Sequence, residues 1–123
     1  MNIVYVAIGG ALGSVFRYLI SILVTRGVGH PSWVGTLLVN VAGSFLIALF
    51  VALESRQPAN HGYFRHLMVV GFCGGFTTFS TFTHEAYQLY MAGDSRLALL
   101  YTISSLLLSV GGLLLGLFVA SKI

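Results

Sequence analysis

The sequence predicts an all-α integral membrane protein with four transmembrane helices, the third of them broken near its middle. Three observations lead to this prediction. Of the 123 residues, 57% are hydrophobic and only 7% are charged; the apolar residues fall into four long runs; and the third run carries a cluster of glycines and hydroxyls. Soluble domains have about 25% charged residues, so this chain could not cover a water-facing surface.

The four hydrophobic runs cover roughly residues 3–24, 33–53, 62–90 and 96–120, within a single domain of residues 1–123. Short polar turns at 26–32, 54–61 and 92–95 separate them. Turns this short force neighbouring spans to run antiparallel. We therefore expect a multi-pass membrane protein built as a pair of helical hairpins.

The third run is too long for one simple span. About 29 residues at about 1.5 Å each reach about 44 Å, whereas the hydrocarbon core is about 30 Å thick. Gly74 and Gly75 weaken the helix and free backbone groups, so we expect a break near 74–78. Broken helices near the midplane often place ion ligands, and a glycine-packed kink without a ligand is the alternative.

Positive charge is balanced between the two ends of the spans. One end holds Arg56, Arg65 and Lys122, and the other holds Arg26 and Arg96, with Arg17 near the end of the first run. The positive-inside rule then gives little direction, so copies inserted both ways could pair antiparallel; a single orientation set by subtler signals is the alternative. The net charge of +3 is attributed to loop arginines, and no nucleic-acid partner is expected.

Polar side chains within the runs are candidates for an ion path. Asn40 lies near the centre of the second run, where it either cross-links helices or lines a polar path. Tyr101, Ser105 and Ser109 recur every four residues on the fourth run and form one stripe of hydroxyls. Serines in spans also bond to their own helix, which is the plainer interpretation of the stripe.

Phe79 and Phe82 share one helical face of the third run. Their plain interpretation is packing, but an aromatic ring has a positive edge that can face a poorly hydrated anion. Conduction needs binding that is weak enough to allow release, which a full positive charge would not give.

Glycines at helical spacing indicate close helix packing. The first run has Gly9, Gly10 and Gly13, and the fourth has Gly112 and Gly116. Small residues at this spacing let helix backbones approach closely, and they carry no chemistry of their own.

Three motifs in order resemble the Fluc (CrcB) fluoride channels across the whole chain. They are Gly9-Gly10-x-x-Gly13-x-x-x-Arg17-Tyr18, Gly35-Thr36-Leu37-x-Val39-Asn40-x-x-Gly43-Ser44-Phe45 and Gly71-Phe72-x-Gly74-Gly75-Phe76-Thr77-Thr78-Phe79-Ser80-Thr81-Phe82. The resemblance implies a fluoride-selective channel, and no enzyme, that exports fluoride passively from the cytoplasm across the bacterial inner membrane and relieves fluoride toxicity. It further implies an antiparallel, dual-topology homodimer with two pores.

The resemblance also implies the site residues. A structural sodium ion, which is not transported, would be held at the dimer centre by the backbone carbonyls of Gly74 and Thr77. Fluoride would pass along Asn40, Phe79, Phe82, Tyr101, Ser105 and Ser109, joined by Ser80 and Thr81. Arg17 would lie near a vestibule rather than in the narrow path.

Two other functions remain open. A small proton-coupled multidrug exporter also has four spans, but it needs a carboxylate deep in a span. Glu54 and Asp94 fall in turns, which leaves Glu85, expected near a membrane edge where it lines a vestibule or faces water. A non-transporting helical assembly factor would explain the glycines but not Asn40 or the hydroxyls.

Overall fold

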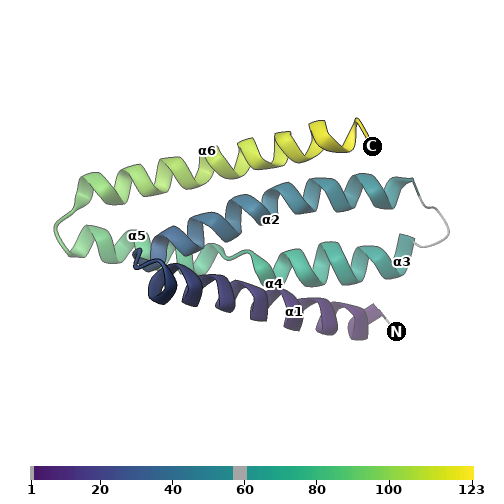
Figure 1. The fold of residues 1–123 in the computed structure, drawn as a ribbon, viewed down its shortest axis with the longest axis horizontal. Helices are drawn as coiled ribbons and strands as arrows, with labels where there is room; N and C mark the ends of the chain where they lie inside the picture. The colour runs from purple at the N-terminus through teal and green to yellow at the C-terminus, as the bar shows by residue number, and fades with distance from the viewer. Residues whose placement is uncertain (1, 57–60) are drawn as a thin grey trace.

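The computed structural model describes residues 2–56 and 61–123, and these residues form helices and turns without a β-strand. The spans lie side by side, and successive spans run in opposite directions (Figure 1). Both chain ends lie at the same end of the bundle as the C-terminal end of the second span. The predicted all-α, four-span fold is therefore confirmed at this level.

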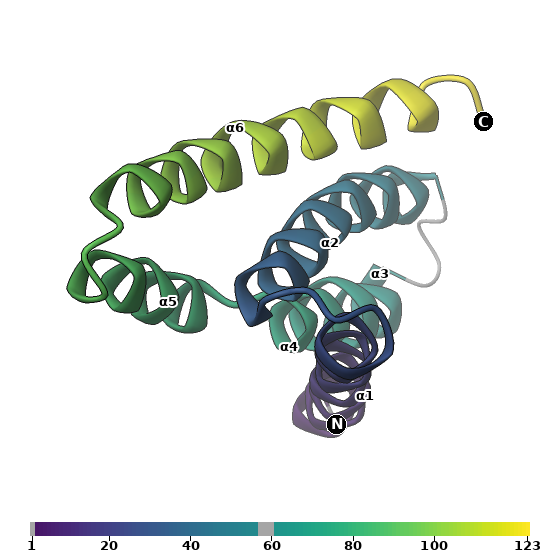
Figure 2. The ribbon, with the colours of Figure 1, turned by 60° about the vertical axis from the view of Figure 1, so that its left-hand side comes forward.

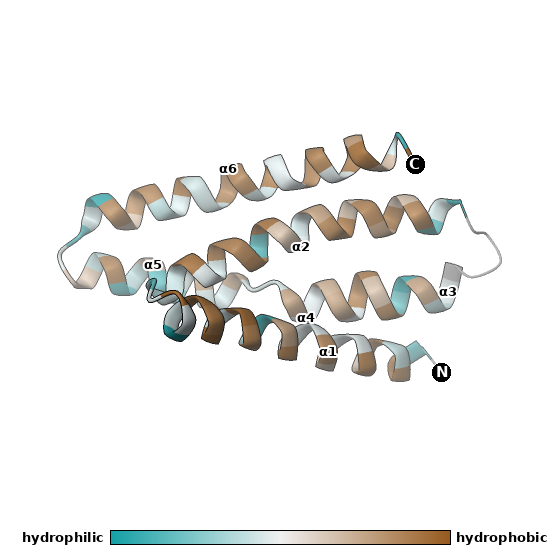
Figure 3. Ribbon diagram, viewed as in Figure 1, coloured by the Kyte–Doolittle hydropathy of each residue, from teal (hydrophilic) through white to brown (hydrophobic). Residues whose placement is uncertain are grey.

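Three of the spans are nearly continuous helices. The first is α1 (Asn2–Ile22) with a π-helical continuation η1 (Leu23–Gly27), the second is α2 (Ser32–Ser55), and the fourth is α6 (Ser95–Ala120). Each is long and apolar enough to cross a membrane. In Figure 3, hydrophobic residues cover most of their length, with hydrophilic residues near the ends and within α2.

The third span is divided into four consecutive pieces. These are α3 (His61–Phe64), the π-helical segment η3 (Arg65–Cys73), α4 (Gly74–Phe76) and α5 (Phe79–Met91). They follow one another in one row across Figure 1, and an extended connection separates α4 from α5. This connection is the interruption on which the site is built.

The turn into the fourth span follows directly from its residues. Gly93 has φ +88°, a left-handed conformation that glycine adopts without steric cost. Asp94 then accepts a hydrogen bond from the amide of Leu97 at 3.0 Å and caps the start of α6. The turn reverses the chain so that α6 packs beside α5 and α2.

The first span packs on the third at backbone distance. A methyl group placed on Gly13 would lie 2.2 Å from the carbonyl oxygen of Phe72, and one on Gly9 would lie 2.0 Å from that of Leu67. No other residue type fits either position without displacing backbone. Figure 2 shows the result, with α1 against α4 on one side of the molecule and α6 on the other.

The fourth span packs on the second in the same way. A methyl group on Gly112 would lie 2.7 Å from the carbonyl oxygen of Val41, and one on Gly116 would lie 2.4 Å from that of Phe45. The packing role predicted for the glycines of both runs is confirmed by these contacts. The second span is thus held between the third and the fourth.

Polar contacts fasten the ends of the spans opposite the α5–α6 turn. Arg65 of η3 forms a salt bridge with the buried carboxylate of Glu54 at 3.1 Å, and Arg56 donates to the carbonyl oxygen of Ala120 at 2.7 Å. The second bond places a cation at the C-terminal end of α6, where the helix dipole favours it. These contacts join the spans at this end of the bundle, away from the interruption of the third span.

We expect Gly13→Ala to lower the free energy of unfolding by about 1–3 kcal/mol, because the added methyl group collides with backbone rather than with a movable side chain. Gly111→Ala is the matched control. A methyl group there meets nothing within 4 Å and replaces a glycine inside α6, so this variant should be as stable or slightly more stable. Thermal unfolding in detergent compares the two, and equal melting temperatures would contradict the packing described here.

Candidate functional site

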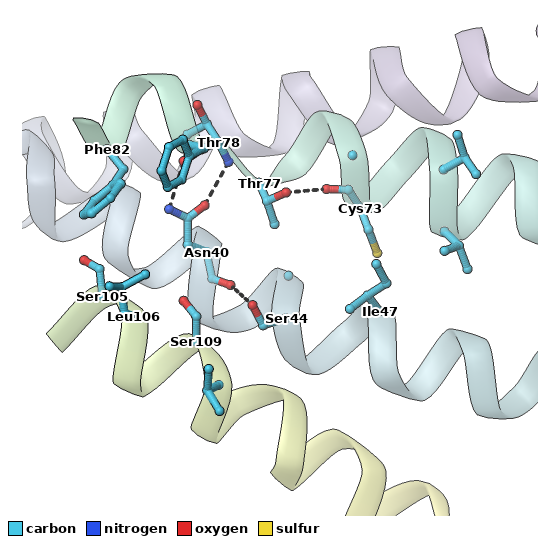
Figure 4. A pocket seen from close by; sticks show the side chains of 16 residues that line it. Asn40, Ser44, Ile47, Cys73, Thr77, Thr78, Phe82, Ser105, Leu106 and Ser109 are labelled. Carbon is cyan, nitrogen blue, oxygen red and sulfur yellow. Dashed lines mark hydrogen bonds between the residues drawn. The ribbon is translucent and has the colours of Figure 1, made fainter. Parts of the chain in front are cut away.

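A groove of about 610 Å³ runs along the middle of the molecule beside the interruption. Its walls come from α2, from both sides of the break in the third span, and from α6 (Figure 4). None of its described lining residues carries a charge. Its polar lining consists of hydroxyls, one amide and backbone groups, contributed by Asn40, Ser44, Gly74, Thr77, Thr78, Ser105 and Ser109.

The interruption lies at Thr77 and Thr78, whose ψ angles of 160° and 123° are those of extended backbone. The prediction that Gly74 and Gly75 unwind the helix is wrong in its cause, since both are helical in α4. A methyl group on Gly75 would lie 2.4 Å from the carbonyl oxygen of Gly10, so this glycine is required by close packing on α1. The two β-branched threonines, which favour extended backbone, form the break.

Asn40 holds the extended segment from the second span. Its Nδ2 donates to the carbonyl oxygen of Thr78 at 3.0 Å, and its Oδ1 accepts from the amide of Thr78 at 2.8 Å. The side chain therefore pairs with the N–H and the C=O of one residue as a neighbouring strand would, and both bonds are drawn in Figure 4. Of the two alternatives, cross-linking helices and lining a path, Asn40 does the first and also borders the groove. Its amide carries a second hydrogen on Nδ2.

Thr78 also begins the helix after the break. Its Oγ1 accepts a hydrogen bond from the amide of Thr81 at 3.2 Å, which makes Thr78 the N-cap of α5. The same hydroxyl donates to Oγ1 of Thr81 at 3.0 Å and lies 3.4 Å from the hydroxyl of Ser80. Ser80 and Thr81 thus gather around the cap and are not among the residues that line the groove.

Sequence reasoning missed Thr78 as a site residue. Its signal was present, because a threonine directly before a helical run is a strong N-cap candidate. On the other side of the break, Thr77 closes α4: its hydroxyl and its amide both donate to the carbonyl oxygen of Cys73, at 2.9 and 3.0 Å. The helix therefore ends at a defined residue and restarts two residues later.

The two phenylalanines have different surroundings. Phe82 is only 5% exposed, and its ring packs against Tyr101 in an edge-to-face arrangement with centroids 5.4 Å apart. Phe79 is 72% exposed, although its ring lies 5.5 Å from that of Phe82. Both rings line the groove, one from its wall and the other from its open side.

The hydroxyl stripe of α6 divides into two parts. Ser105 and Ser109 line the groove, and Oγ of Ser105 is buried without a hydrogen-bond partner among the described residues. The Tyr101 hydroxyl, in contrast, donates to the Glu85 carboxylate at 2.9 Å, and Tyr101 is not among the lining residues. The Tyr101 hydroxyl is therefore bonded to a buried carboxylate beside the groove, and its part in the polar track stays a prediction.

Glu85 is buried, so of its two expected surroundings, a vestibule or water, the second is wrong. The Glu85 side chain is 7% exposed. It lies on the same face of α5 as Phe82, which precedes Glu85 by three residues. Burial of a carboxylate is costly unless it is hydrogen-bonded, and Tyr101 supplies that bond. The signal that could have revealed this was the i, i+3 spacing of Glu85 and Phe82.

Arg17 contacts the end of α4, and its predicted place near a vestibule stays a prediction. Its Nε donates to the carbonyl oxygen of Gly75 at 3.1 Å, and the Ser14 hydroxyl lies 3.5 Å from the same oxygen. Arg17 thus places a positive charge at the C-terminal end of α4, where the carbonyls have lost helical partners. Its contact is with the break itself because Gly10 and Gly13 bring α1 close to this end.

Comparison with known proteins places the chain among named relatives. Residues 4–117 match the family model described as CrcB-like protein, Camphor Resistance (CrcB). The chain is 44% identical over 117 residues to the Fluoride-specific ion channel FluC of Agrobacterium fabrum, covering 95% of this chain and 94% of that protein. It is 45% identical over 114 residues to the FluC of Nitrobacter winogradskyi, covering 93% and 90%, and 36% identical over 122 residues to that of Flavobacterium psychrophilum, covering 99% and 98%.

Proposed function

Because the chain belongs to the CrcB family, we propose that it is a fluoride-selective channel that exports fluoride passively across the bacterial inner membrane and so relieves fluoride toxicity. The family is one of ion channels and not of enzymes, which confirms the prediction that this chain is no enzyme. Its relatives are named as fluoride-specific ion channels. The polar, uncharged lining of the groove supports the same function for this chain.

The observation that carries the proposal is the lining of the groove, which offers hydroxyl and amide groups and, among the described residues, no charged side chain; Ser105 is one of these hydroxyls. An anion that enters the groove would lose part of its water, and donors along the walls would replace the lost hydrogen bonds. Ser109 adds a donor on the α6 wall, and the second amide hydrogen of Asn40 adds one on the α2 wall. The ring of Phe82 adds a positive edge, so a small anion would exchange its water for weak neutral contacts.

The absence of charge among the described lining residues supports conduction rather than tight binding. A lysine or arginine in a groove shielded from water would hold fluoride strongly, because Coulomb attraction grows as the dielectric falls. Hydroxyl, amide and ring-edge contacts are individually weak, and an ion can leave them quickly. Tyr101 would contribute by packing against Phe82 and holding its ring in place. Ser80 and Thr81 would contribute hydroxyls beside the N-cap of α5.

The carbonyl groups at the break suit a bound sodium ion. Gly74 and Thr77 both line the groove, and their carbonyls would form the ligands, two from each protomer of a two-fold dimer. Neutral oxygens without carboxylates favour a monovalent cation over a divalent one. When bound, sodium would supply a fixed positive charge at the dimer centre as a structural element that is not transported.

An antiparallel homodimer would complete both features. Phe79 is a large aromatic side chain exposed at the open side of the groove, and a second copy would cover it and form the other wall. The even distribution of arginines between the two ends of the bundle is compatible with insertion in both orientations. The dimer would then contain two grooves related by symmetry, each forming one pore.

Liposomes test this function directly. Vesicles loaded with potassium fluoride and containing the protein are expected to release fluoride when a potassium ionophore is added, since electrogenic exit of an anion needs a compensating cation flow. Chloride-loaded vesicles should retain their chloride. Release of chloride at a similar rate, or no fluoride release from intact dimers, would contradict the proposal.

The multidrug-exporter alternative is tested in the same vesicles. That function needs a carboxylate that exchanges a proton for a bulky cation, and Glu85 is enclosed and hydrogen-bonded to Tyr101 rather than open to a substrate. We therefore expect no proton-driven efflux of a cationic dye. Dye efflux that is abolished by Glu85→Gln would favour the exporter.

A further inference from the structure

The carbonyl of Gly74 loses its helical partner to a side chain from the second span. In a continuous helix the amide of Thr78 would donate to the carbonyl oxygen of Gly74, four residues before it. Here that amide donates to Oδ1 of Asn40 at 2.8 Å. The hydrogen that would occupy the Gly74 carbonyl is therefore held by Asn40.

The carbonyl of Thr77 loses its partner in a parallel way. Its helical partner would be the amide of Thr81, but that amide donates to Oγ1 of Thr78 at 3.2 Å. Two side chains, Asn40 and Thr78, thus take the two amide hydrogens that a regular helix would give to these carbonyls. Both carbonyls belong to residues that line the groove.

One of the two carbonyls between them, that of Gly75, already has side-chain partners. It accepts from Nε of Arg17 at 3.1 Å, with the Ser14 hydroxyl at 3.5 Å. The side chains of three spans therefore determine how the carbonyls of the break are bonded: that of Gly75 accepts from a protein cation, and those of Gly74 and Thr77 lose their helical partners. This arrangement depends on tertiary contacts and not on the flexibility of the glycines.

We propose that Asn40 and Thr78 are positioning residues of the cation site, and that they act by withholding the amide hydrogens of Thr78 and Thr81 from its two carbonyl ligands. This inference rests on the proposed function, which assigns those carbonyls to sodium. It adds a connection between the two sites. Asn40 lines the anion groove and binds the amide of Thr78, which forms one peptide unit with the carbonyl of Thr77 in the cation site. Cation binding and anion passage are then linked, and such coupling is reciprocal for binding free energies.

The test measures the sodium dependence of thermal stability. Protein is purified in N-methylglucamine salts, and its melting temperature is followed as sodium replaces that cation at constant ionic strength. Thr78→Val removes the hydroxyl while keeping the shape of the side chain, and Asn40→Leu removes the amide at similar volume. Each is expected to raise the sodium concentration for half-maximal stabilisation about tenfold, the equivalent of one lost hydrogen bond.

Two variants serve as controls. Thr78→Ser keeps the hydroxyl and should restore the wild-type midpoint. Thr83→Val makes the same chemical change on an exposed part of α5, where the hydroxyl donates only to the carbonyl oxygen of Ser80, and should leave the midpoint unchanged. If Thr78→Val fails to fold without sodium, recovery of folded protein at high sodium is expected by the same linkage.

The outcomes separate the two proposals. Wild-type midpoints in both Thr78→Val and Asn40→Leu would overturn the positioning role and leave the fluoride channel and its sodium site standing. A wild-type protein whose melting temperature does not respond to sodium would overturn the cation site and this inference with it, while fluoride release from liposomes would still be measured independently.

Discussion

Phe82→Ile is expected to reduce fluoride flux by up to about tenfold while leaving the protein folded and assembled. Isoleucine preserves most of the buried apolar volume, but it lacks the positive ring edge that would face the anion. An aromatic contact of this kind contributes about 0.5–1.5 kcal/mol, and about 1.4 kcal/mol on a barrier corresponds to a tenfold change in rate. Phe82 is buried beside Tyr101, which packs edge-to-face against its ring.

Phe118→Ile is the matched control for this variant. Phe118 lies near the end of α6, where its ring is exposed beneath the ammonium group of Lys122 and is not among the groove-lining residues. Its replacement should leave fluoride efflux from liposomes unchanged. Equal efflux rates in wild type, Phe82→Ile and Phe118→Ile would remove Phe82 from the ion path.

Tyr101→Phe is expected to destabilise the protein by about 1.5–3 kcal/mol, the contribution of a hydrogen bond to a charged group. The substitution removes only the hydroxyl that donates to the buried Glu85 carboxylate and keeps the ring that packs on Phe82 and Trp33. The loss follows from leaving a buried acceptor unsatisfied. Thermal or denaturant unfolding of the reconstituted or detergent-solubilised protein measures it.

A double-mutant cycle identifies the cause of this loss. In Tyr101→Phe/Glu85→Gln the carboxylate is absent, so the second substitution should recover part of the stability lost in the first. Strictly additive losses in the two single variants and the double variant would show that the Tyr101–Glu85 bond contributes nothing. The same outcome would mean that Tyr101 acts only through its ring.

The membrane class and the packing of the spans could be predicted from the sequence, because hydrophobic run length and glycine spacing act locally. The glycines of α1 and α6 lie against backbone as their spacing indicated, at Gly13 and Gly112 for example. Such positions tolerate no side chain whatever the rest of the fold does. Local patterns therefore determine which faces meet.

The details of the break could not be predicted, because they depend on contacts between spans. Gly75 is a weak helix former, yet its approach to Gly10 keeps it helical. The helix ends instead where Asn40, 38 residues earlier in the chain, binds the peptide of Thr78. No local rule connects an asparagine in one span with a threonine in another, and the same limit applies to Arg17 and Gly75.

The burial of Glu85 shows a different limit. Its position within the third run suggested proximity to a membrane edge, but distance along the helix does not determine which face of α5 packs on α6. Phe82 and Glu85 share that face, and Tyr101 lies opposite both. A carboxylate that follows a core aromatic at helical spacing is therefore a candidate for a buried hydrogen-bonded group, and this pattern could guide future sequence analysis.

The reversal potential of currents in a planar bilayer tests the central claim, which is that the uncharged groove beside the broken third span passes fluoride and rejects other halides. With a tenfold fluoride gradient and equal chloride on both sides, the current should reverse about 59 mV from zero, the equilibrium value for a monovalent ion, with the sign of an anion. Reversal at zero would mean that chloride carries the current, and reversal with the opposite sign would mean that a cation does; either result would contradict the account.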